Sequence, residues 1–190
     1  QHVHRISPTI LFEITDRCNL QCPHCYHLPE DNQDRPIADI INQLQSFPSH
    51  YFYQACLAGA EPTLRKDLNE LCSELKHKIK NISDLTMVTN GIKFQNLKFT
   101  KSAFDAGLDA ACIGLNHWSY QGEKVHTNQL KGIQNRKETG LDIGYIGYTL
   151  ETLNDMEEVL EEIGNFDNDV TETYRIRCGS FIGRSSDSQR

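Results

Sequence analysis

Three cysteines near the start of the chain, Cys18, Cys22 and Cys25, have the spacing of metal ligands. Three thiolates this close on one loop can converge on a metal centre. A single zinc ion takes four ligands, and His24 or His27 could supply the fourth. A [4Fe–4S] cluster usually takes four cysteines, and no fourth lies nearby in the sequence. Three cysteines would leave one iron open to a substrate or cofactor. The spacing therefore predicts a metal centre, with zinc and an open cluster as the alternatives.

The remaining four of the seven cysteines stand singly in the sequence, at Cys56, Cys72, Cys112 and Cys178. An odd cysteine count in a 190-residue chain whose first eight residues are polar argues against a secreted disulfide framework. We therefore expect a cytoplasmic protein with reduced thiols. The first three lie in apolar strand or helix patterns and are predicted to be buried, inert thiols. Cys178 ends the last predicted strand, where packing is favoured over contact with a substrate.

Alternating strands and helices must position these cysteines. Apolar segments predict six strands, at residues 10–14, 51–58, 85–89, 109–115, 142–150 and 172–178. Amphipathic patterns predict five helices between them, at residues 36–48, 62–79, 94–106, a stretch ending at 140, and 152–163. Such alternation is typical of parallel sheets with right-handed crossovers. Six units fall short of the eight of a closed barrel. The predicted fold is therefore α/β, a partial (β/α)6 TIM-like open barrel with parallel strands.

The domain organisation follows from the same pattern. No linker divides the chain, so residues 1–183 are predicted to form one core domain. Residues 184–190 are polar and follow the sixth strand, where a sixth helix is expected. We therefore expect this tail to begin the C-terminal region of a longer protein.

The charge of the chain limits its partners. There are 19 basic and 26 acidic residues, which give a formal net charge of −7. Proteins that bind nucleic acid by bulk electrostatics usually carry a basic face, so this charge argues against such a partner. No apolar run reaches the roughly 18 residues that a membrane-spanning helix needs. We expect neither a nucleic-acid partner nor a membrane span.

The cysteine spacing C-x3-C-x2-C, directly after a first strand, resembles the radical S-adenosylmethionine (radical SAM) superfamily. The resemblance implies that Cys18, Cys22 and Cys25 hold a [4Fe–4S] cluster whose open iron is chelated by the amino and carboxylate groups of S-adenosylmethionine. It also implies that an electron from the cluster cleaves the sulfonium, giving a 5′-deoxyadenosyl radical that takes a hydrogen atom from the substrate. His24, in the position that packs on the adenine, and Tyr26 are implied cofactor contacts.

Two further matches follow the second and third predicted strands. The segment Ala58–Pro62 (AGAEP) is similar to the family's Gly-Gly-Glu-Pro motif. The similarity implies that the methionine amino group of the cofactor is held by Gly59, Ala60, Glu61 and Pro62. The second glycine of that motif is alanine here, which leaves its backbone contacts possible. Asn90, within Thr89-Asn90-Gly91, is a common companion in the family and an implied cofactor contact. Taken alone, Glu61 also suits a helix N-terminal acid stabilised by the helix dipole.

The fourth predicted strand ends in Ile113-Gly114-Leu115-Asn116, similar to a family segment that often reads Ile-Ser-Leu-Asp and approaches the ribose. Gly114 has no hydroxyl, so Asn116 is the polar candidate, although an asparagine here suits a plain turn equally well. His117 and Trp118 follow at the predicted top of the barrel. His117 is a candidate for the substrate pocket, whereas Trp118 is better interpreted as an ordinary loop residue.

Two arginines in the sixth strand suggest the charge of a substrate. Arg175 and Arg177 are two residues apart and therefore share one face of the strand. The outer face of such a barrel is covered by apolar helix surface, so the arginines are predicted to lie inside, as is Glu13 of the first strand. Guanidinium groups bind phosphate and carboxylate groups bidentately. We therefore expect an acidic substrate.

The segments 15–19 (TDRCN) and 61–68 (EPTLRKDL) are similar to a clade of the superfamily that includes molybdenum-cofactor GTP cyclases and peptide-maturing enzymes. We expect a radical SAM enzyme that acts on a small acidic metabolite or nucleotide, with a peptide as the alternative substrate. The resemblance also implies an electron donor such as flavodoxin or ferredoxin. The alternatives from other classes are an iron–sulfur electron-transfer protein and a zinc-stabilised binding module. The subgroup, and whether the cofactor is consumed or regenerated, stay open.

Overall fold

The computed structural model of the chain describes residues 8–22, 25, 33–48, 52–115, 122–150, 154–165 and 174–178. Its strands are β1 (Thr9–Glu13), β2 (Tyr53–Ala58), β3 (Ile82–Thr89), β4 (Ala110–Gly114), β5 (Asp142–Leu150) and β6 (Tyr174–Cys178). Its α-helices are α1 (Ile37–Gln45), α2 (Leu68–Lys78), α3 (Leu97–Asp105), α5 (Glu123–Thr139) and α6 (Asn154–Asn165). Strand and helix alternate along the chain as the sequence predicts.

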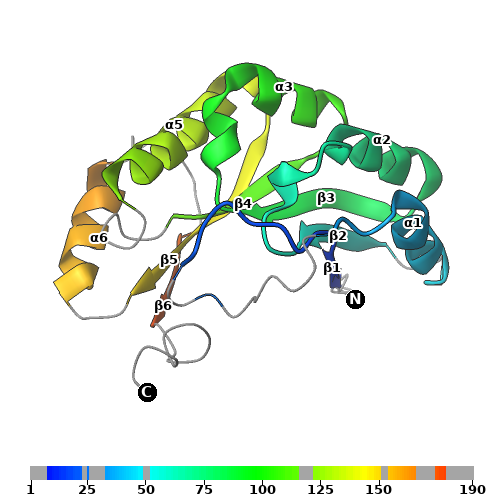
Figure 1. Cartoon of the computed structure of the whole chain (residues 1–190), viewed down its shortest axis with the longest axis horizontal. Helices are drawn as coiled ribbons and strands as arrows, with labels where there is room; N and C mark the ends of the chain where they lie inside the picture. The colour runs from blue at the N-terminus through cyan, green and yellow to red at the C-terminus, as the bar shows by residue number, and fades with distance from the viewer. Residues whose placement is uncertain are drawn as a thin grey trace, which may run out of the picture.

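The six strands form one parallel sheet in the order β1-β2-β3-β4-β5-β6. The helices follow one another in an arc along one side of this sheet, and none of the described helices lies on the opposite side (Figure 1). The described residues contain no pairing between β6 and β1, so the barrel is open. This arrangement confirms the predicted partial (β/α)6 barrel.

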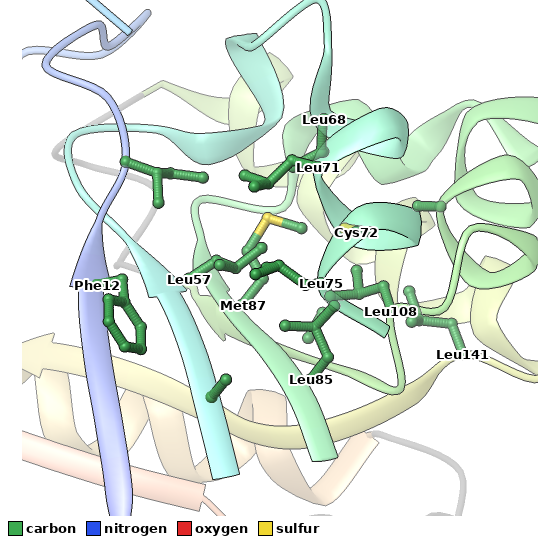
Figure 2. Packing of buried hydrophobic residues seen from close by; sticks show 14 of the residues in the cluster. Phe12, Leu57, Leu68, Leu71, Cys72, Leu75, Leu85, Met87, Leu108 and Leu141 are labelled. Atoms are coloured by element: carbon green, nitrogen blue, oxygen red, sulfur yellow. The ribbon is translucent and has the colours of Figure 1, made fainter. Parts of the chain in front are cut away.

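The hydrophobic core lies between the sheet and its helices. Phe12, Leu57 and Met87 are in register on neighbouring strands and are buried. Apolar side chains of α2 pack on the same side of the sheet, among them Leu71 and Leu75 (Figure 2). Alternate residues of a strand point to opposite faces. The residues between these core positions therefore lie on the concave face, where Leu11 is 55% exposed and Glu13 is also exposed.

Two predicted helices are each interrupted. The pattern over residues 62–79 divides into a 3₁₀ turn at Pro62–Leu64 and α2, because Arg65 has an extended backbone with ψ 133°. The pattern over 94–106 divides into a 3₁₀ turn at Ile92–Gln95 and α3. There the Asn96 side chain accepts a hydrogen bond from the amide of Phe99 and begins a new helix. Polar side chains that bond to nearby backbone compete with helix continuation, and apolar periodicity does not report that competition.

The isolated cysteines of the core are placed as predicted. Cys56, Cys72 and Cys112 are buried and are in the reduced, thiol form. Burial raises the pKa of the Cys72 thiol to about 12, well above the pKa of cysteines that react as thiolates. Separately, the described helices include none with the length and apolar character needed to cross a membrane.

Candidate active site at the carboxyl ends of the first three strands

The segments that follow β1, β2 and β3 meet at one edge of the sheet, because the carboxyl ends of parallel strands lie together. The segment that carries the three cysteines, residues 15–34, follows β1, and we call it the cysteine-bearing segment. The Ala58–Pro62 motif follows β2, and the Asn90–Gly91 turn follows β3. Loops at this edge carry the active sites of barrel enzymes. The fold therefore brings together three of the four motifs that the sequence singled out.

The three clustered cysteines are reduced and half-buried. The amide of Cys25 donates to the carbonyl oxygen of Cys22 at 3.1 Å, and the amide of Leu20 donates to Cys18 Sγ at 3.4 Å. Burial raises the pKa of Cys18, and the negative charges of Glu61 and Cys25 raise it further against the opposing bond from Leu20. Cys25 is thus near enough to Cys18 to influence the ionisation of the Cys18 thiol.

The three thiols are suitable ligands for a metal centre. Among the described residues, no three His, Cys, Asp or Glu side chains are gathered closely enough to hold one metal ion. In a cubane cluster each thiolate binds a different iron, so the thiols surround a group several ångströms wide. Three reduced thiols on one segment fit a [4Fe–4S] group with one open iron.

The motif after β2 lies directly against the segment that leads to Cys18. The amide of Ala60 donates to the carbonyl oxygen of Thr15 at 2.9 Å, and the amide of Glu61 donates to that of Arg17 at 2.8 Å. Gly59 has φ +126°, and a Cβ there would stand 2.4 Å from the Thr15 carbonyl oxygen. Only glycine allows this approach, whereas the alanine at position 60 is accommodated.

Glu61 is buried, with 1% of its surface exposed, and it accepts four hydrogen bonds. Oε1 accepts from the Thr63 amide (3.1 Å), the Thr63 hydroxyl (2.5 Å) and the Thr89 hydroxyl (2.7 Å). Oε2 accepts from the Asn90 amide at 2.7 Å. Burial raises the pKa of this carboxyl, although the four donors act in the opposite direction. Glu61 thus caps the 3₁₀ turn and also ties the end of β2 to the end of β3, and a carboxylate oxygen such as Oε2 can accept more than one hydrogen bond.

Asn90 links the turn after β3 to the cysteine-bearing segment. Its Nδ2 donates to Asn19 Oδ1 at 2.9 Å, beside Cys18. Its Oδ1 accepts from the amide of Ile92 at 3.0 Å, which fixes the turn. Asn90 therefore stands at the predicted cofactor site with its side chain already oriented.

Gln129 of α5 is a site residue that sequence reasoning misses. It is fully buried, and its Nε2 donates to the carbonyl oxygens of Asn90 (2.6 Å) and Gly114 (2.9 Å). It thereby fixes the ends of β3 and β4 relative to each other. Its position in an ordinary amphipathic helix gives no sequence signal of this contact.

Several predicted site residues are not tested by these contacts. His24, Tyr26, Asn116, His117 and Trp118 lie outside the described residues. Glu13 pairs with Ala58 and lies on the face opposite the core. Arg175 and Arg177 pair in register with Gly147 and Thr149. For β6 the structure describes the backbone and leaves the side chains undescribed. Their roles stay predictions.

Comparison with known proteins decides the family. The model of the Radical SAM superfamily matches residues 12–163, which include every strand from β2 to β5 and all three clustered cysteines. The chain belongs to the radical SAM superfamily. The predicted family and the predicted class, a radical SAM enzyme, are confirmed.

Curated relatives of this radical SAM chain have several names. It is 29% identical to the 7,8-dihydro-6-hydroxymethylpterin dimethyltransferase of Methanocaldococcus jannaschii, over 72% of this chain and 29% of that protein. It is 32% identical to the GTP 3′,8-cyclase of Lactiplantibacillus plantarum, over 59% of this chain and 34% of that protein. It is also 32% identical to a probable GTP 3′,8-cyclase of Sulfolobus acidocaldarius, over 67% and 42%. The chain thus spans less than half the length of these three relatives.

Solved structures match the fold of the radical SAM chain. A crystal structure of Streptococcus suis SuiB bound to S-adenosylmethionine matches 93% of this chain and 51% of that chain, with a TM-score of 0.50 and 12% identity. A structure of SuiB bound to precursor peptide SuiA matches 97% and 52%, with a TM-score of 0.50 and 13% identity. At this identity the likeness supports the shared fold.

Proposed function

We propose that this chain is the core of a radical SAM enzyme, in which Cys18, Cys22 and Cys25 bind a [4Fe–4S] cluster. The observation that supports this most directly is the hydrogen bonding between the cysteine-bearing segment and two other strand ends. The Glu61 amide donates to the Arg17 carbonyl oxygen, and the Asn90 side chain donates to Asn19. Arg17 and Asn19 flank Cys18, so these hydrogen bonds hold the first cysteine beside the Ala58–Pro62 motif and the Asn90 turn.

S-adenosylmethionine is the second cofactor that we propose, bound beside the thiols by Gly59, Ala60, Glu61, Pro62 and Asn90. Gly59 brings the backbone of the motif against Thr15 without a side chain between them. Glu61 presents a carboxylate that is held by four donors, so its remaining acceptor position is fixed in direction. An ammonium group is a suitable partner for such a carboxylate.

When both are bound, these cofactors supply a one-electron cleavage that produces a 5′-deoxyadenosyl radical able to abstract hydrogen from a substrate. The electron would come from an external donor such as flavodoxin or ferredoxin. The chain's own residues would bind and orient the cofactors, and the hydrogen bonds from Thr63 and Thr89 to Glu61 join the ends of β2 and β3.

For the substrate we propose a nucleotide or another small acidic metabolite. Two observations favour this class. Relatives of the chain are named GTP 3′,8-cyclase. Arg175 and Arg177 pair with Gly147 and Thr149 of β5, and these two positions alternate with the buried Ile146 and Tyr148. We propose that the two arginines lie on the concave face, where guanidinium groups would meet a phosphate.

Anaerobic reconstitution with iron and sulfide tests the cofactor assignment. We expect a brown protein that binds about four irons and forms 5′-deoxyadenosine from S-adenosylmethionine when a strong reductant is added. Cys22→Ala should lose the colour and the product, whereas the control variant Cys72→Ala, which alters a thiol of α2 that is buried in the hydrophobic core, should retain both. A brown protein that forms no 5′-deoxyadenosine would indicate electron transfer. A colourless protein that binds zinc would indicate a zinc-stabilised module. Either result contradicts the proposal.

GTP is the probe for the substrate class. Calorimetric titration should detect binding of GTP by the reconstituted protein, and Arg177→Ala should weaken it at least tenfold. Lys98→Ala, at an exposed position of α3, is the control and should leave binding unchanged. Absence of GTP binding, or equal binding by the Arg177 variant, would overturn this assignment and favour a peptide substrate.

A further inference from the structure

Arg17, directly before the first cysteine, joins three separate segments of the chain. Its Nε donates to Asp34 Oδ1 at 3.1 Å, and its Nη2 contacts Asp34 Oδ2. The same Nη2 donates to the carbonyl oxygen of Leu64 at 3.1 Å. Arg17 thus connects the start of the cysteine-bearing segment to the end of that segment and to the turn that follows Glu61.

Arg65 joins the same three regions from the other side. Its Nη1 donates to the carbonyl oxygen of Ile14 at 2.6 Å and to that of Arg35 at 2.7 Å. Its Nε and Nη2 donate to the carboxylate of Asp67 at 3.0 and 2.8 Å. Only 1% of the Arg65 side chain is exposed. A buried guanidinium needs partners for its donors and a counter-charge, and this one has both.

Backbone hydrogen bonds also join the two ends of the cysteine-bearing segment, which together form a closed loop. Thr15 and Asp34 form an antiparallel bridge, and the Thr15 hydroxyl donates to Asp34 Oδ1 at 2.7 Å. The Asp16 amide donates to the carbonyl oxygen of Gln33 at 3.0 Å, and the Arg35 amide donates to that of Ile14 at 2.9 Å. The two ends of the cysteine-bearing segment are therefore fastened together where they leave and rejoin the barrel.

Arginine has the geometry that this closure requires. The guanidinium is a planar fork with five donors, so one side chain can bond to a carboxylate and to carbonyl oxygens in different directions. A lysine ammonium is a compact charge on a flexible stem and reproduces only part of such a set. The break in the helical pattern at Arg65 serves this closure. The backbone of Arg65 is extended, so Arg65 lies between the 3₁₀ turn and α2 and belongs to neither.

We propose that Arg17 and Arg65 are positioning residues for the metal centre, and that they close the loop carrying Cys18, Cys22 and Cys25. A closed loop has fewer conformations, so its three thiolates are held near one another before any cluster binds. The part of this inference that concerns the cluster rests on the proposed function. Loop closure itself is a property of the metal-free protein and is tested separately.

Hydrogen exchange of the metal-free protein tests the closure. In Arg65→Met, the protection of the Asp16 and Arg35 amides should fall at least tenfold, whereas the Leu71 and Leu75 amides of α2 should keep theirs. Lys76→Met is the matched control, because it removes an ion pair with Asp109 at the opposite, amino-terminal end of the strands. That variant should leave the Asp16 and Arg35 amides protected. Unchanged protection in Arg65→Met would overturn the proposal.

A second variant serves in case Arg65→Met does not fold. The Arg17 side chain is 29% exposed, so Arg17→Met removes its contacts with less disturbance of the core. It should increase exchange at Asp16 locally, and Arg17→Lys should restore part of the protection. Equal exchange in the wild type and in Arg17→Met would contradict the inference.

Iron content links closure to the metal centre. After reconstitution and desalting, Arg17→Met and Arg65→Met should retain less than half of the wild-type iron and sulfide, whereas Lys76→Met should retain all of it. Full retention in both arginine variants would refute the positioning role. If the wild type itself takes up no iron, the proposed function fails, and the exchange measurements still decide whether the two arginines close the loop.

Discussion

Replacing Gly59 by alanine should destabilise the protein by about 3 kcal/mol, because two independent costs meet at this position. The backbone has φ +126°, a conformation that costs a residue with a side chain roughly 1–3 kcal/mol. The new Cβ would also stand 2.4 Å from the Thr15 carbonyl oxygen, about 1 Å inside an ordinary contact distance.

The backbone fixes the position of the new Cβ, and the Thr15 oxygen is itself a backbone atom, so no side-chain rotation can relieve the contact. The two segments must separate, which weakens the bonds from Ala60 to Thr15 (2.9 Å) and from Glu61 to Arg17 (2.8 Å). Each is worth about 1 kcal/mol net. Alanine also reduces the freedom of the unfolded chain, which offsets about 0.4–1 kcal/mol of the loss.

Alanine substitutions at three other glycines distinguish the cost of a positive φ from the cost of a steric clash at the new Cβ. Gly122 has φ +85° and open space around it, so Gly122→Ala should cost about 1 kcal/mol. Gly132 is helical, and a Cβ there would meet the Gly91 carbonyl oxygen at 2.7 Å, so Gly132→Ala should also cost about 1 kcal/mol net. Gly164 lies in helix α6 with open space around it, so Gly164→Ala should stabilise the protein by about 1 kcal/mol.

Urea denaturation of the four variants, followed by far-ultraviolet circular dichroism, measures these differences. The expected order of stability is Gly164→Ala above wild type, Gly122→Ala and Gly132→Ala below it, and Gly59→Ala lowest. If Gly59→Ala matched Gly122→Ala within about 0.5 kcal/mol, the close approach of Gly59 to Thr15 would contribute nothing, and the reasoning about this motif would be refuted.

Three further predictions concern the core and its buried acids. Leu75→Ala should lower the free energy of unfolding by about 2–5 kcal/mol, because Leu75 is fully buried against the sheet; a loss below 1 kcal/mol in urea denaturation would contradict this. Cys72 has a folded-state pKa of about 12 against an ordinary 9.0, so its stabilising contribution is complete below pH 9 and is lost as pH rises toward 12. The wild type should therefore lose about 1.4 kcal/mol per pH unit in this window relative to Cys72→Ala, and parallel pH profiles would contradict the assignment. Burial likewise raises the pKa of Glu61 above its ordinary 4.5, so the wild type should lose stability relative to Glu61→Gln as pH rises from 4.5 through the folded-state pKa; urea midpoints at pH 4, 5 and 6 test that direction.

Local patterns predicted most of the fold correctly. The strand over 142–150 agrees with β5 at both ends, and the helix expected to end at residue 140 does so, where Gly140 has φ +83°. Periodicity and glycine punctuation are properties of neighbouring residues, so they can be read without the fold. The interruption at Arg65 could not be read, because the partners of its guanidinium include the carbonyl oxygen of Ile14, 51 positions away.

The candidate site divides in the same way. The three cysteines and the Ala58–Pro62 motif were visible because each is a short run of the sequence, and each resembles a family signature. The anchoring residues Asp34 and Gln129 were not visible, because nothing in their local sequence distinguishes them from ordinary polar residues. Their importance comes from the carbonyl oxygens and charges that distant segments bring to them.

The sequence by itself determined the order of strands and helices, the parallel open barrel and the identity of the three thiols. It could do so because apolar spacing, turn residues and cysteine spacing are local. Only the tertiary structure decided which side chains hold those thiols in place. Hydrogen bonds and ion pairs depend on three-dimensional distance, and Glu61 meets Asn90, and Arg17 meets Leu64, only after the strand ends have been brought to one edge of the sheet.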